Sequence, residues 1–424
     1  MTSEHRRSAA VVALAGLACA LASALGPAAF VRAQGAVTVP VPDAAPLMLG
    51  PPRTEHGGAA ALGLLLRRLG TVKRVLVVGA HPDDEDTQLL AALALGQGAD
   101  AAYLSLTRGE GGQNAIGGEL QEALGLLRTE ELLSARRLDG ALQFFTRAYD
   151  YGFSKSAEEA FRHWPRDSVL ADVVRVVRLF RPDLVVRVFT GTPRDGHGQH
   201  QVSGLVAREA FRAAADPARF AGQLGEGLRP WRPRKLYRST RFRPEEATVW
   251  LETGVLDPLL GRSWAQVAAA SRSRHRSQDM GQAERPGPQR AWLRREEPSP
   301  GAGEVERSPF DGVDTTLSMR ARALGAPGRV VRWLEGYDAD VLRLRASYNP
   351  LEPDRLVPGL ARALAVLRQA DSALAGVAGE GAAELRFLLA GERADAEEAL
   401  ARAAGLVLDA VADDDRVVPG QTFG

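Results

Sequence analysis

The chain has 424 residues, 45% of them hydrophobic, and this length and composition predict a globular protein with one large domain and a second, smaller one. Its 53 basic and 52 acidic side chains leave a net charge of +1. Because such a chain has no overall field of one sign, nucleic acid is not expected among its partners.

Residues 1–33 have the pattern of an export signal peptide. Arg6 and Arg7 precede a long apolar run, and the stretch that ends at Ala33 offers small residues where a signal peptidase would cut. We therefore expect a periplasmic or extracellular protein with no stable membrane insertion after cleavage. The alternative is an uncleaved membrane anchor, since the run is about as long as a spanning helix. Cys19, the only cysteine, lies in this run, so a mature chain would have no disulfide and no cysteine metal site.

From residue 73 onward, after a lead-in at 34–72, strand-like and helix-like patterns alternate. This alternation predicts an α/β fold, with a Rossmann-like, mostly parallel sheet and helices on both of its faces. The expected strands are residues 74–79, 100–107, 142–145, 184–189, 235–239 and 248–251, and the expected helices are residues 85–97, 118–138, 168–180, 199–215 and 263–277.

The last third of the chain has a different character. Residues 281–309 are dense in Pro, Gly, Arg and Glu and are expected to form a linker or surface excursion. Residues 310–424 carry leucines at helical spacing, which predicts a smaller helical C-terminal region. Because residues 413–424 resemble the start of a β-rich domain, we also expect the chain to be a fragment or a truncated relative of a longer protein.

The strongest chemical signal is Ala-His-Pro-Asp-Asp-Glu at residues 80–85, where the first strand gives way to a helix. In open α/β sheets, ligands bind at the carboxyl ends of the strands. His81 and Asp84 are ordinary zinc ligands, which leaves Asp83 as the general base for a metal-activated water. The alternative is that these acids only cap the helix N-terminus, where negative charge is favoured. A cap needs one carboxylate and leaves His81 idle, so a metal site is favoured.

A second cluster, at residues 195–200, follows the strand at 184–189 and so reaches the same edge of the sheet. A catalytic zinc site uses three protein ligands. We assign His200 to the metal and His197 to the substrate carbonyl, where a protonated imidazole would stabilise the oxyanion. The alternative, two surface histidines in a Gly-rich loop, is disfavoured because the chain has only seven histidines. Two histidines and one aspartate suit Zn²⁺, and also Fe²⁺.

Together these segments resemble the PIG-L or LmbE-like family of zinc-dependent de-N-acetylases, named for N-acetylglucosaminylphosphatidylinositol de-N-acetylase, in its exported branch. The resemblance covers roughly residues 73–280, which it makes the deacetylase domain. Besides the two motifs above, it includes Leu-Thr-Arg-Gly-Glu-Gly-Gly at 106–112, Arg-Thr-Glu-Glu at 128–131, Arg-Pro-Asp-Leu at 181–184 and His-Arg-Ser-Gln at 275–278.

The resemblance implies the same metal ligands, base and oxyanion-stabilising histidine, and it adds a substrate contact from Arg128. The alternative for Arg128 is an exposed helix arginine paired with Glu131 or Glu122. His275 is expected to orient the site from behind the ligands. Its alternative is a solvent-facing histidine in an Arg-rich helix.

One position departs from the family's pattern. The second motif of the family often reads His-x-Asp-His, whereas Gln199 occupies the acidic position here. We hypothesise that Asp195 replaces that acid as the partner that keeps His197 protonated. An Asp195→Ala variant with unchanged activity would rule this out.

The expected function is that of a metal-dependent hydrolase that removes an N-acyl group, such as acetyl, from an N-acetylglucosamine-like sugar or conjugate. The substrate class rests on the family resemblance alone. One alternative is an amidase or esterase with a non-sugar acyl substrate. A second is a non-catalytic, metal-bearing carbohydrate-binding protein that uses its helical C-terminal region as the interface. The competent residue at every key position argues against this second alternative. A dinucleotide site is excluded, since the first strand turn lacks G-x-G-x-x-G.

Overall fold

The structure, a computed structural model, describes residues 55–297 and 306–407. The predicted signal peptide at residues 1–33, with Cys19, and the chain end at 413–424 lie outside these ranges. Across the described ranges, no helix is both long enough and apolar enough to span a bilayer.

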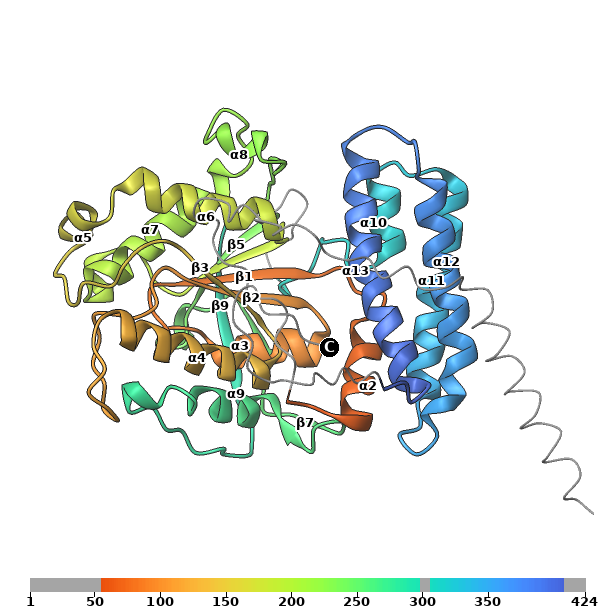
Figure 1. The fold of residues 1–424 in the computed structure, drawn as a ribbon, viewed down its shortest axis with the longest axis horizontal. Helices are drawn as coiled ribbons and strands as arrows, with labels where there is room; N and C mark the ends of the chain where they lie inside the picture. The colour runs from red at the N-terminus through yellow and green to blue at the C-terminus, as the bar shows by residue number, and fades with distance from the viewer. Residues whose placement is uncertain (1–54, 298–305, 408–424) are drawn as a thin grey trace, which may run out of the picture. The chain divides into compact units, whose positions relative to one another are not determined.

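A mixed sheet forms the centre of the α/β part of the molecule (Figure 1). Its strands are β1 Arg74–Gly79, β2 Asp100–Ser105, β3 Leu142–Phe145, β4 Leu184–Arg187, β5 Lys235–Ser239, β6 Val249–Glu252 and β9 Arg290–Glu297, and a separate hairpin pairs β7 Leu256–Asp257 with β8 Arg262–Ser263. The order in the main sheet is β3-β2-β1-β4-β5-β9-β6. Neighbours from β3 to β5 are parallel, while β9 runs antiparallel to both β5 and β6. The predicted mostly parallel sheet is confirmed.

Helices cover both faces of this sheet, as predicted. The helices of the α/β part are α3 Thr87–Ala91 with its π-helical continuation η1 Ala92–Gly96, α4 Glu122–Asp139, α5 Ala157–His163, α6 Arg166–Phe180, α7 Gly198–Ala213, α8 Gly222–Gly225 and α9 Trp264–Arg272, with 3-10 turns η2 Pro193–Asp195, η3 Pro244–Glu246 and η4 Arg276–Gln278. One core joins α3 and α4 to the sheet, and the other joins α5, α6 and α7 to its opposite face. Side chains of β1 alternate between these cores, Val75 and Val77 in the first and Leu76 and Val78 in the second, so that the strand is buried on both faces.

The structure also contains elements that the sequence analysis did not predict, among them β9 and α5. Strand β9 lies inside residues 281–309, which were expected to be a linker or surface excursion, so that expectation is wrong for this part of the chain. Only Ala291 and Leu293 are buried there, and the charged residues on both sides of this pair, Arg290 and those at 294–297, hide the period-2 pattern. Helix α5 was also missed, because its seven residues are too few to show a helical period.

The predicted helical C-terminal region is confirmed in the described residues. It consists of α10 Leu317–Ala323, α11 Gly328–Ser347, α12 Val357–Ala373 and α13 Glu380–Ala403, with the turn η5 Pro353–Leu356. These helices share one hydrophobic core with α2 Gly58–Arg68, which lies in the predicted lead-in at 34–72.

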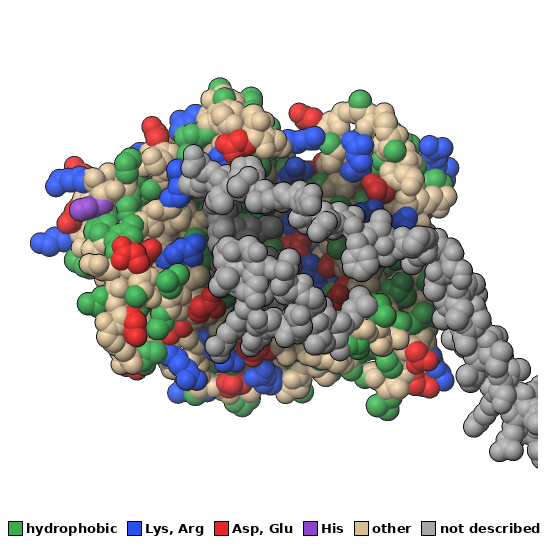
Figure 2. Space-filling view, viewed as in Figure 1, with side chains coloured by type: hydrophobic (Ala, Val, Ile, Leu, Met, Phe, Trp, Pro, Cys, Tyr) green, Lys and Arg blue, Asp and Glu red, His purple; other side chains and the backbone are tan. Residues whose placement is uncertain are grey.

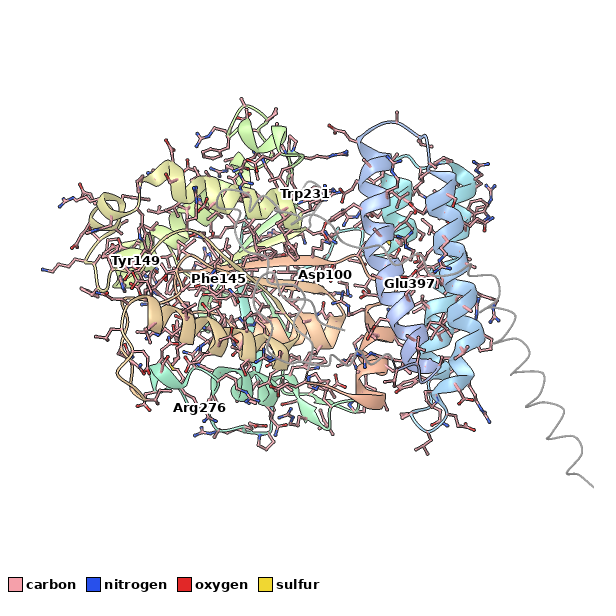
Figure 3. The ribbon with its side chains drawn as sticks, in the orientation of Figure 1. Asp100, Phe145, Tyr149, Trp231, Arg276 and Glu397 are labelled. Carbon is pink, nitrogen blue, oxygen red and sulfur yellow. The ribbon has the colours of Figure 1, made fainter. Side chains whose placement is uncertain are left out.

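Ion pairs link this helical region to the amino ends of the strands. Arg320 of α10 pairs with Asp183, just before β4, at 2.7 Å, and Arg68 pairs with both Asp100 at the start of β2 and Asp395 of α13. In Figure 3, Asp100 lies at the opposite end of the sheet from Phe145, which ends β3. The helical region therefore contacts the sheet at the end away from the loops that carry the predicted site. On the face shown in Figure 2, basic and acidic side chains are interspersed, in keeping with the net charge of +1.

Candidate metal centre

The loops that follow β1 and β4 meet at the carboxyl edge of the sheet, because these two strands are neighbours. The first loop carries the 80–85 motif, and the second runs through η2 into α7. Strand β1 has β2 and then β3 on one side, and β4 and then β5 on the other, so the strand order reverses at β1. In open α/β sheets the crevice at such a switch point binds ligands.

His81, Asp84 and His200 form a compact group of candidate metal ligands, in which one donor atom from each residue lies within 4.8 Å of the others. His81 Nδ1 lies 3.3 Å from Asp84 Oδ2, and His200 Nε2 lies 3.4 Å from Asp84 Oδ1. Ligand atoms of a tetrahedral zinc site with bonds of about 2.0–2.1 Å stand about 3.4 Å apart. The two histidines and one carboxylate are therefore a donor set that fits zinc.

Gln199 orients His81. Its Oε1 lies 2.7 Å from His81 Nε2, so the ring donates from Nε2 and keeps Nδ1 for a metal. The amide of Gln199 is itself fixed, because its Nε2 donates to Asp150 Oδ1 at 3.1 Å and to the Gly152 carbonyl at 2.8 Å. The residue that departs from the family's motif thus positions a ligand, a role that sequence reasoning missed.

The other two ligands are held as firmly. Asp84 Oδ2 accepts two backbone N–H groups of its own loop at 3.0 and 2.7 Å, which leaves Oδ1 facing His200. Burial opposes the charge of Asp84, but the charges of His200 and His81 lower its pKa below the ordinary value. The His200 ring stacks on Phe189 at 3.9 Å, and its Nδ1 lies 3.3 Å from the Asp195 carbonyl, so Nε2 faces the site.

His197 lies beside the ligands, its ring 5.2 Å from that of His81 and 4.9 Å from that of His200. Burial, and then the charges of those two rings, lower the pKa of His197 to about 4. Its Nδ1 accepts the Gln199 N–H at 3.2 Å, so the neutral ring carries its hydrogen on Nε2. The protonated imidazole that we expected is therefore not favoured. The neutral ring can still donate its Nε2–H to a substrate oxygen.

The hypothesis that Asp195 keeps His197 protonated is wrong. The Asp195 carboxylate accepts the N–H groups of Thr190, Gly191 and Thr192 and so folds the loop after β4. Its link to His197 runs through the backbone, from the His197 N–H to the Asp195 carbonyl at 2.8 Å. Asp195 thus shapes the loop that presents both histidines.

Asp83 is partly buried and has a φ of 103°, a region that favours glycine. Burial, together with the charges of Asp84 and Glu85, raises the pKa of Asp83 to about 6. A carboxylate of that pKa is suited to accept a proton near neutral pH. The capping alternative does not apply to Asp83 or Asp84, because Asp86 caps α3 and accepts the Leu89 N–H at 3.1 Å.

Behind the motif, Glu85 and His275 are both fully buried. His275 Nε2 lies 2.7 Å from Glu85 Oε1, and Arg136 donates to the same oxygen at 3.2 Å. The alternative of a solvent-facing His275 is therefore wrong. Sequence reasoning missed the roles of Glu85 and Arg136, although Arg136 follows Leu132 by one helical turn on the inward face of α4, which was a usable signal.

Arg128 lies on the same inward face of α4 and is only 3% exposed. Its Nη2 donates to the Gln113 carbonyl at 2.6 Å. A Cβ at Gly109 or Gly112 would lie 2.6 or 2.4 Å from Arg128 Nη1, so the Gly-rich segment after β2 makes room for the guanidinium. The carboxylate of Glu131 accepts instead from the backbone N–H and the hydroxyl of Ser277. The alternative of an exposed arginine paired with a glutamate of its own helix is therefore wrong.

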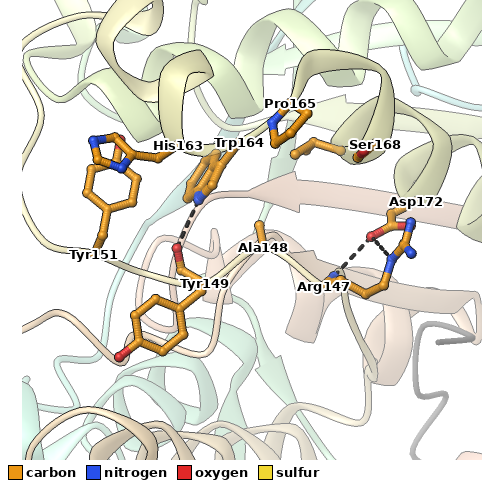
Figure 4. Close-up of a pocket in the computed structure, with 10 residues that line it drawn as sticks. Arg147, Ala148, Tyr149, Tyr151, His163, Trp164, Pro165, Ser168 and Asp172 are labelled. Atoms are coloured by element: carbon orange, nitrogen blue, oxygen red, sulfur yellow. Dashed lines mark hydrogen bonds and ion pairs between the residues drawn. The ribbon is translucent and has the colours of Figure 1, made fainter.

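The loop after β3, residues 146–156, has two roles. Through Asp150 it fixes Gln199, as described above. It also lines a cavity of about 400 Å³ whose walls include Tyr149, Tyr151 and Trp164 (Figure 4). The Trp164 indole is held in place because it donates to the Tyr149 carbonyl at 2.8 Å. This loop therefore joins the support of the metal centre to a neighbouring aromatic cavity.

Known proteins are similar in sequence to this part of the chain. Residues 76–211 match the PIG-L family model, described as GlcNAc-PI de-N-acetylase. The chain is 32% identical to the 1D-myo-inositol 2-acetamido-2-deoxy-alpha-D-glucopyranoside deacetylase of Thermobispora bispora over 189 residues, 40% of this chain and 60% of that protein. It is 26% identical to the mycothiol S-conjugate amidase of Streptomyces coelicolor over 171 residues, 37% of this chain and 58% of that protein.

A solved structure, the N,N'-diacetylchitobiose deacetylase from Pyrococcus horikoshii, is similar with a TM-score of 0.39 and 20% identity, over 49% of this chain and 70% of that one. The chain spans about 60% of the length of the curated relatives named above. The matched residues 76–211 include every candidate metal ligand. The resemblance predicted from the motifs is confirmed: residues 76–211 are similar to the PIG-L family of GlcNAc-PI de-N-acetylases.

Proposed function

We propose that the protein is a zinc-dependent hydrolase that removes the acetyl group from an N-acetylated amino sugar or its conjugate. The observation that carries the proposal is the grouping of His81, Asp84 and His200, with Asp83 and His197 beside them. The substrate class is supported by the name of the T. bispora relative, which is a deacetylase of a 2-acetamido-2-deoxyglucopyranoside. The substrate of this chain is thus proposed to be a small sugar conjugate of that kind.

Zinc at this site would lower the pKa of a water molecule and polarise the amide carbonyl. Asp83 accepts a proton from the attacking water, whose oxygen forms a bond to the amide carbon. His197 donates its Nε2–H to the carbonyl oxygen as that oxygen becomes negative. Protonated Asp83 then gives its proton to the nitrogen, the carbonyl re-forms as the C–N bond breaks, and the free amine leaves together with acetic acid, which ionises to acetate in solution. Arg128, a buried arginine whose pKa is lowered by burial and partly restored by the charge of Asp83, is proposed to hold a polar group of the sugar.

The test combines metal analysis with acetate release from a panel of N-acetylglucosamine conjugates. Asp83→Asn is expected to keep its metal and to lose about 100- to 10,000-fold in kcat, the usual contribution of a general base. Asp167→Asn, which changes an exposed carboxylate on α6, is the matched control and should behave as wild type. A wild type that binds these sugars without hydrolysing them would instead support the carbohydrate-binding alternative.

A second candidate is hydrolysis of an amide other than an N-acetyl group. The similarity to a protein that is named an amidase, and not a deacetylase, favours it. The same panel should therefore include glucosamine carrying N-acyl groups larger than acetyl. A higher kcat/KM for the larger groups than for acetyl would make the protein an amidase rather than a deacetylase.

We also propose that the protein acts outside the cytoplasm, on the strength of the export pattern at residues 1–33. N-terminal sequencing of the protein from periplasmic and culture fractions tests this. A new N-terminus near residue 34 is expected. A full-length protein in the membrane fraction would favour the uncleaved anchor.

A further inference from the structure

Asp83 has a backbone conformation that its surroundings must hold in place. Its φ of 103° lies in the left-handed region, which side chains other than glycine adopt at an energetic cost. Such conformations persist only where neighbouring groups over-determine them, and they gather at functional sites. The groups that hold Asp83 are therefore informative about its role.

The carbonyl groups at and before Asp83 are held by one segment that is distant in the chain. Arg272, at the end of α9, donates from Nη1 to the Asp83 carbonyl at 2.7 Å. Gln278, in η4, donates from Nε2 to the Pro82 carbonyl at 2.5 Å. Both contacts cross about 190 positions of sequence, with separations of 189 and 196 residues. They restrain the peptide planes on both sides of the Asp83 Cα.

The same segment acts on the Asp83 N–H indirectly, through Glu85, which Arg136 of α4 also holds. The Asp83 N–H donates to Glu85 Oε2 at 2.9 Å, and the other oxygen of Glu85 lies 2.7 Å from His275 Nε2. His275 is fully buried, and its Nδ1 has no hydrogen-bond partner among the described residues, so the ring is committed to Glu85. Arg272, His275 and Gln278 together are called the α9 clamp below.

The flanking carbonyls of the motif are also fixed, but by other elements. Tyr103 of β2 donates to the His81 carbonyl at 2.6 Å, and Arg241, after β5, donates to the Glu85 carbonyl at 2.7 Å. The metal ligand Asp84 has its own anchors in the N–H groups of its loop. Removing the α9 clamp should therefore free Asp83 while the metal ligands stay in place.

We propose that the α9 clamp is a positioning device for the general base: by fixing the Asp83 backbone, it aims the Asp83 carboxylate at the attacked water without touching the substrate. This inference rests on the proposed function, in which Asp83 is the base. A displacement of a catalytic group by about 1 Å costs roughly 100-fold in rate. The clamp is thus expected to govern kcat and to leave substrate binding nearly unchanged.

The experiment compares Arg272→Met with Arg272→Lys in the full-length, metal-loaded protein. The methionine removes the donor to the Asp83 carbonyl, and the lysine restores one. Arg274→Met is the matched control, because Arg274 lies two positions on and pairs with Glu55 at 3.0 Å on the surface. Should Arg272→Met fail to fold, His275→Leu and His275→Gln repeat the comparison, since glutamine keeps an N–H donor.

In Arg272→Met, kcat should fall about 100-fold while KM and bound metal each stay within about threefold of wild type. The kcat of Arg272→Lys should be at least about tenfold higher than that of Arg272→Met, and Arg274→Met should have the kcat of wild type. An unchanged kcat would overturn the proposal. So would a loss of metal that parallels the loss of kcat, because the segment would then support the ligands and not the base.

Hydrogen exchange separates failure of this inference from failure of the proposed function. If wild type hydrolyses no conjugate, the proposed function fails, and the clamp is judged by exchange at the amides of residues 83–86. Arg272→Met should exchange there at least about tenfold faster than wild type, with α7 unchanged. Equal exchange rates in the two proteins would overturn the clamp.

Discussion

Replacing Glu392 by glutamine is expected to stabilise the folded protein at neutral and alkaline pH. Glu392 lies on α13 and is 4% exposed. Its Oε1 accepts the Tyr337 hydroxyl at 2.5 Å and the backbone N–H of Gly70, which precedes β1. Burial raises the pKa of this carboxyl to about 8 despite those hydrogen bonds. The group therefore links the helical region to the sheet in its protonated form.

The sign and size of the effect follow from proton linkage. An unfolded glutamate has a pKa of 4.5, and the folded value is about 8, a difference of 8 − 4.5 = 3.5. Between these values the folded chain keeps a proton that the unfolded chain has lost, so the free energy of unfolding falls by about 1.4 kcal/mol per pH unit. The stability is fully present below pH 4.5 and is lost as the pH rises to 8, by about 5 kcal/mol in all. Glutamine is neutral in both states and lacks this slope.

Urea denaturation at pH 5 and pH 8 measures the effect. The free energy of unfolding of Glu392→Gln minus that of wild type should rise by about 4 kcal/mol between the two pH values. Glu397→Gln is the matched control, because it removes an exposed carboxylate from the same helix, one that pairs with Arg368 on the surface. For Glu397→Gln, the free energy of unfolding minus that of wild type should change by less than about 1 kcal/mol between pH 5 and pH 8. A difference for Glu392→Gln that is equal at both pH values would refute the reasoning.

Two further changes test the site and the helical region. Gly112→Ala should raise KM about 10- to 100-fold with metal content and kcat retained, because its Cβ would lie 2.4 Å from Arg128 Nη1 and displace a charged hydrogen-bond donor. Gly118→Ala is the control, since its Cβ meets nothing within 4 Å. Equal KM values for Gly112→Ala and wild type in steady-state assays would contradict the role of Arg128. Arg320→Met should lower the free energy of unfolding by about 3–5 kcal/mol, since it leaves a buried carboxylate unpaired, and should not change kcat. Arg322→Met, on the exposed side of the same helix, is the control and should lower the free energy of unfolding by less than about 1 kcal/mol. A folded Arg320→Met protein without activity would contradict the expectation for kcat and show that this end of the sheet influences the site.

Much of the fold could be predicted because its signals are local. The run at β1 is apolar on both faces, and the helical patterns that follow each strand have a clear period, so the order of elements was readable. Strand β9 was not predicted, because only two of its residues are buried and its charged residues, such as Arg294, mask the alternation of buried and exposed positions. Pairing partners such as β5 and β6 are distant in sequence, and no local pattern encodes them.

The candidate ligands were accessible to sequence reasoning for the same reason. His81 and Asp84 share one turn, and the strand that leads to His200 ends at the same edge of the sheet. The contact between Gln199 and His81 could not be predicted from the sequence, because the two residues are 118 positions apart. The interpretation of Asp195 failed because its carboxylate is used by the loop that it belongs to.

The sequence by itself determined the order of strands and helices, the chemistry of the 80–85 motif and the pair of histidines that completes it, because each depends on neighbours within a few positions. Only the tertiary structure decided which groups support them. Arg272, His275 and Gln278 reach the motif because α9 packs against α3 and α4. Hydrogen bonds of this kind depend on the packing of distant helices, and packing is a property of the whole fold rather than of any one segment.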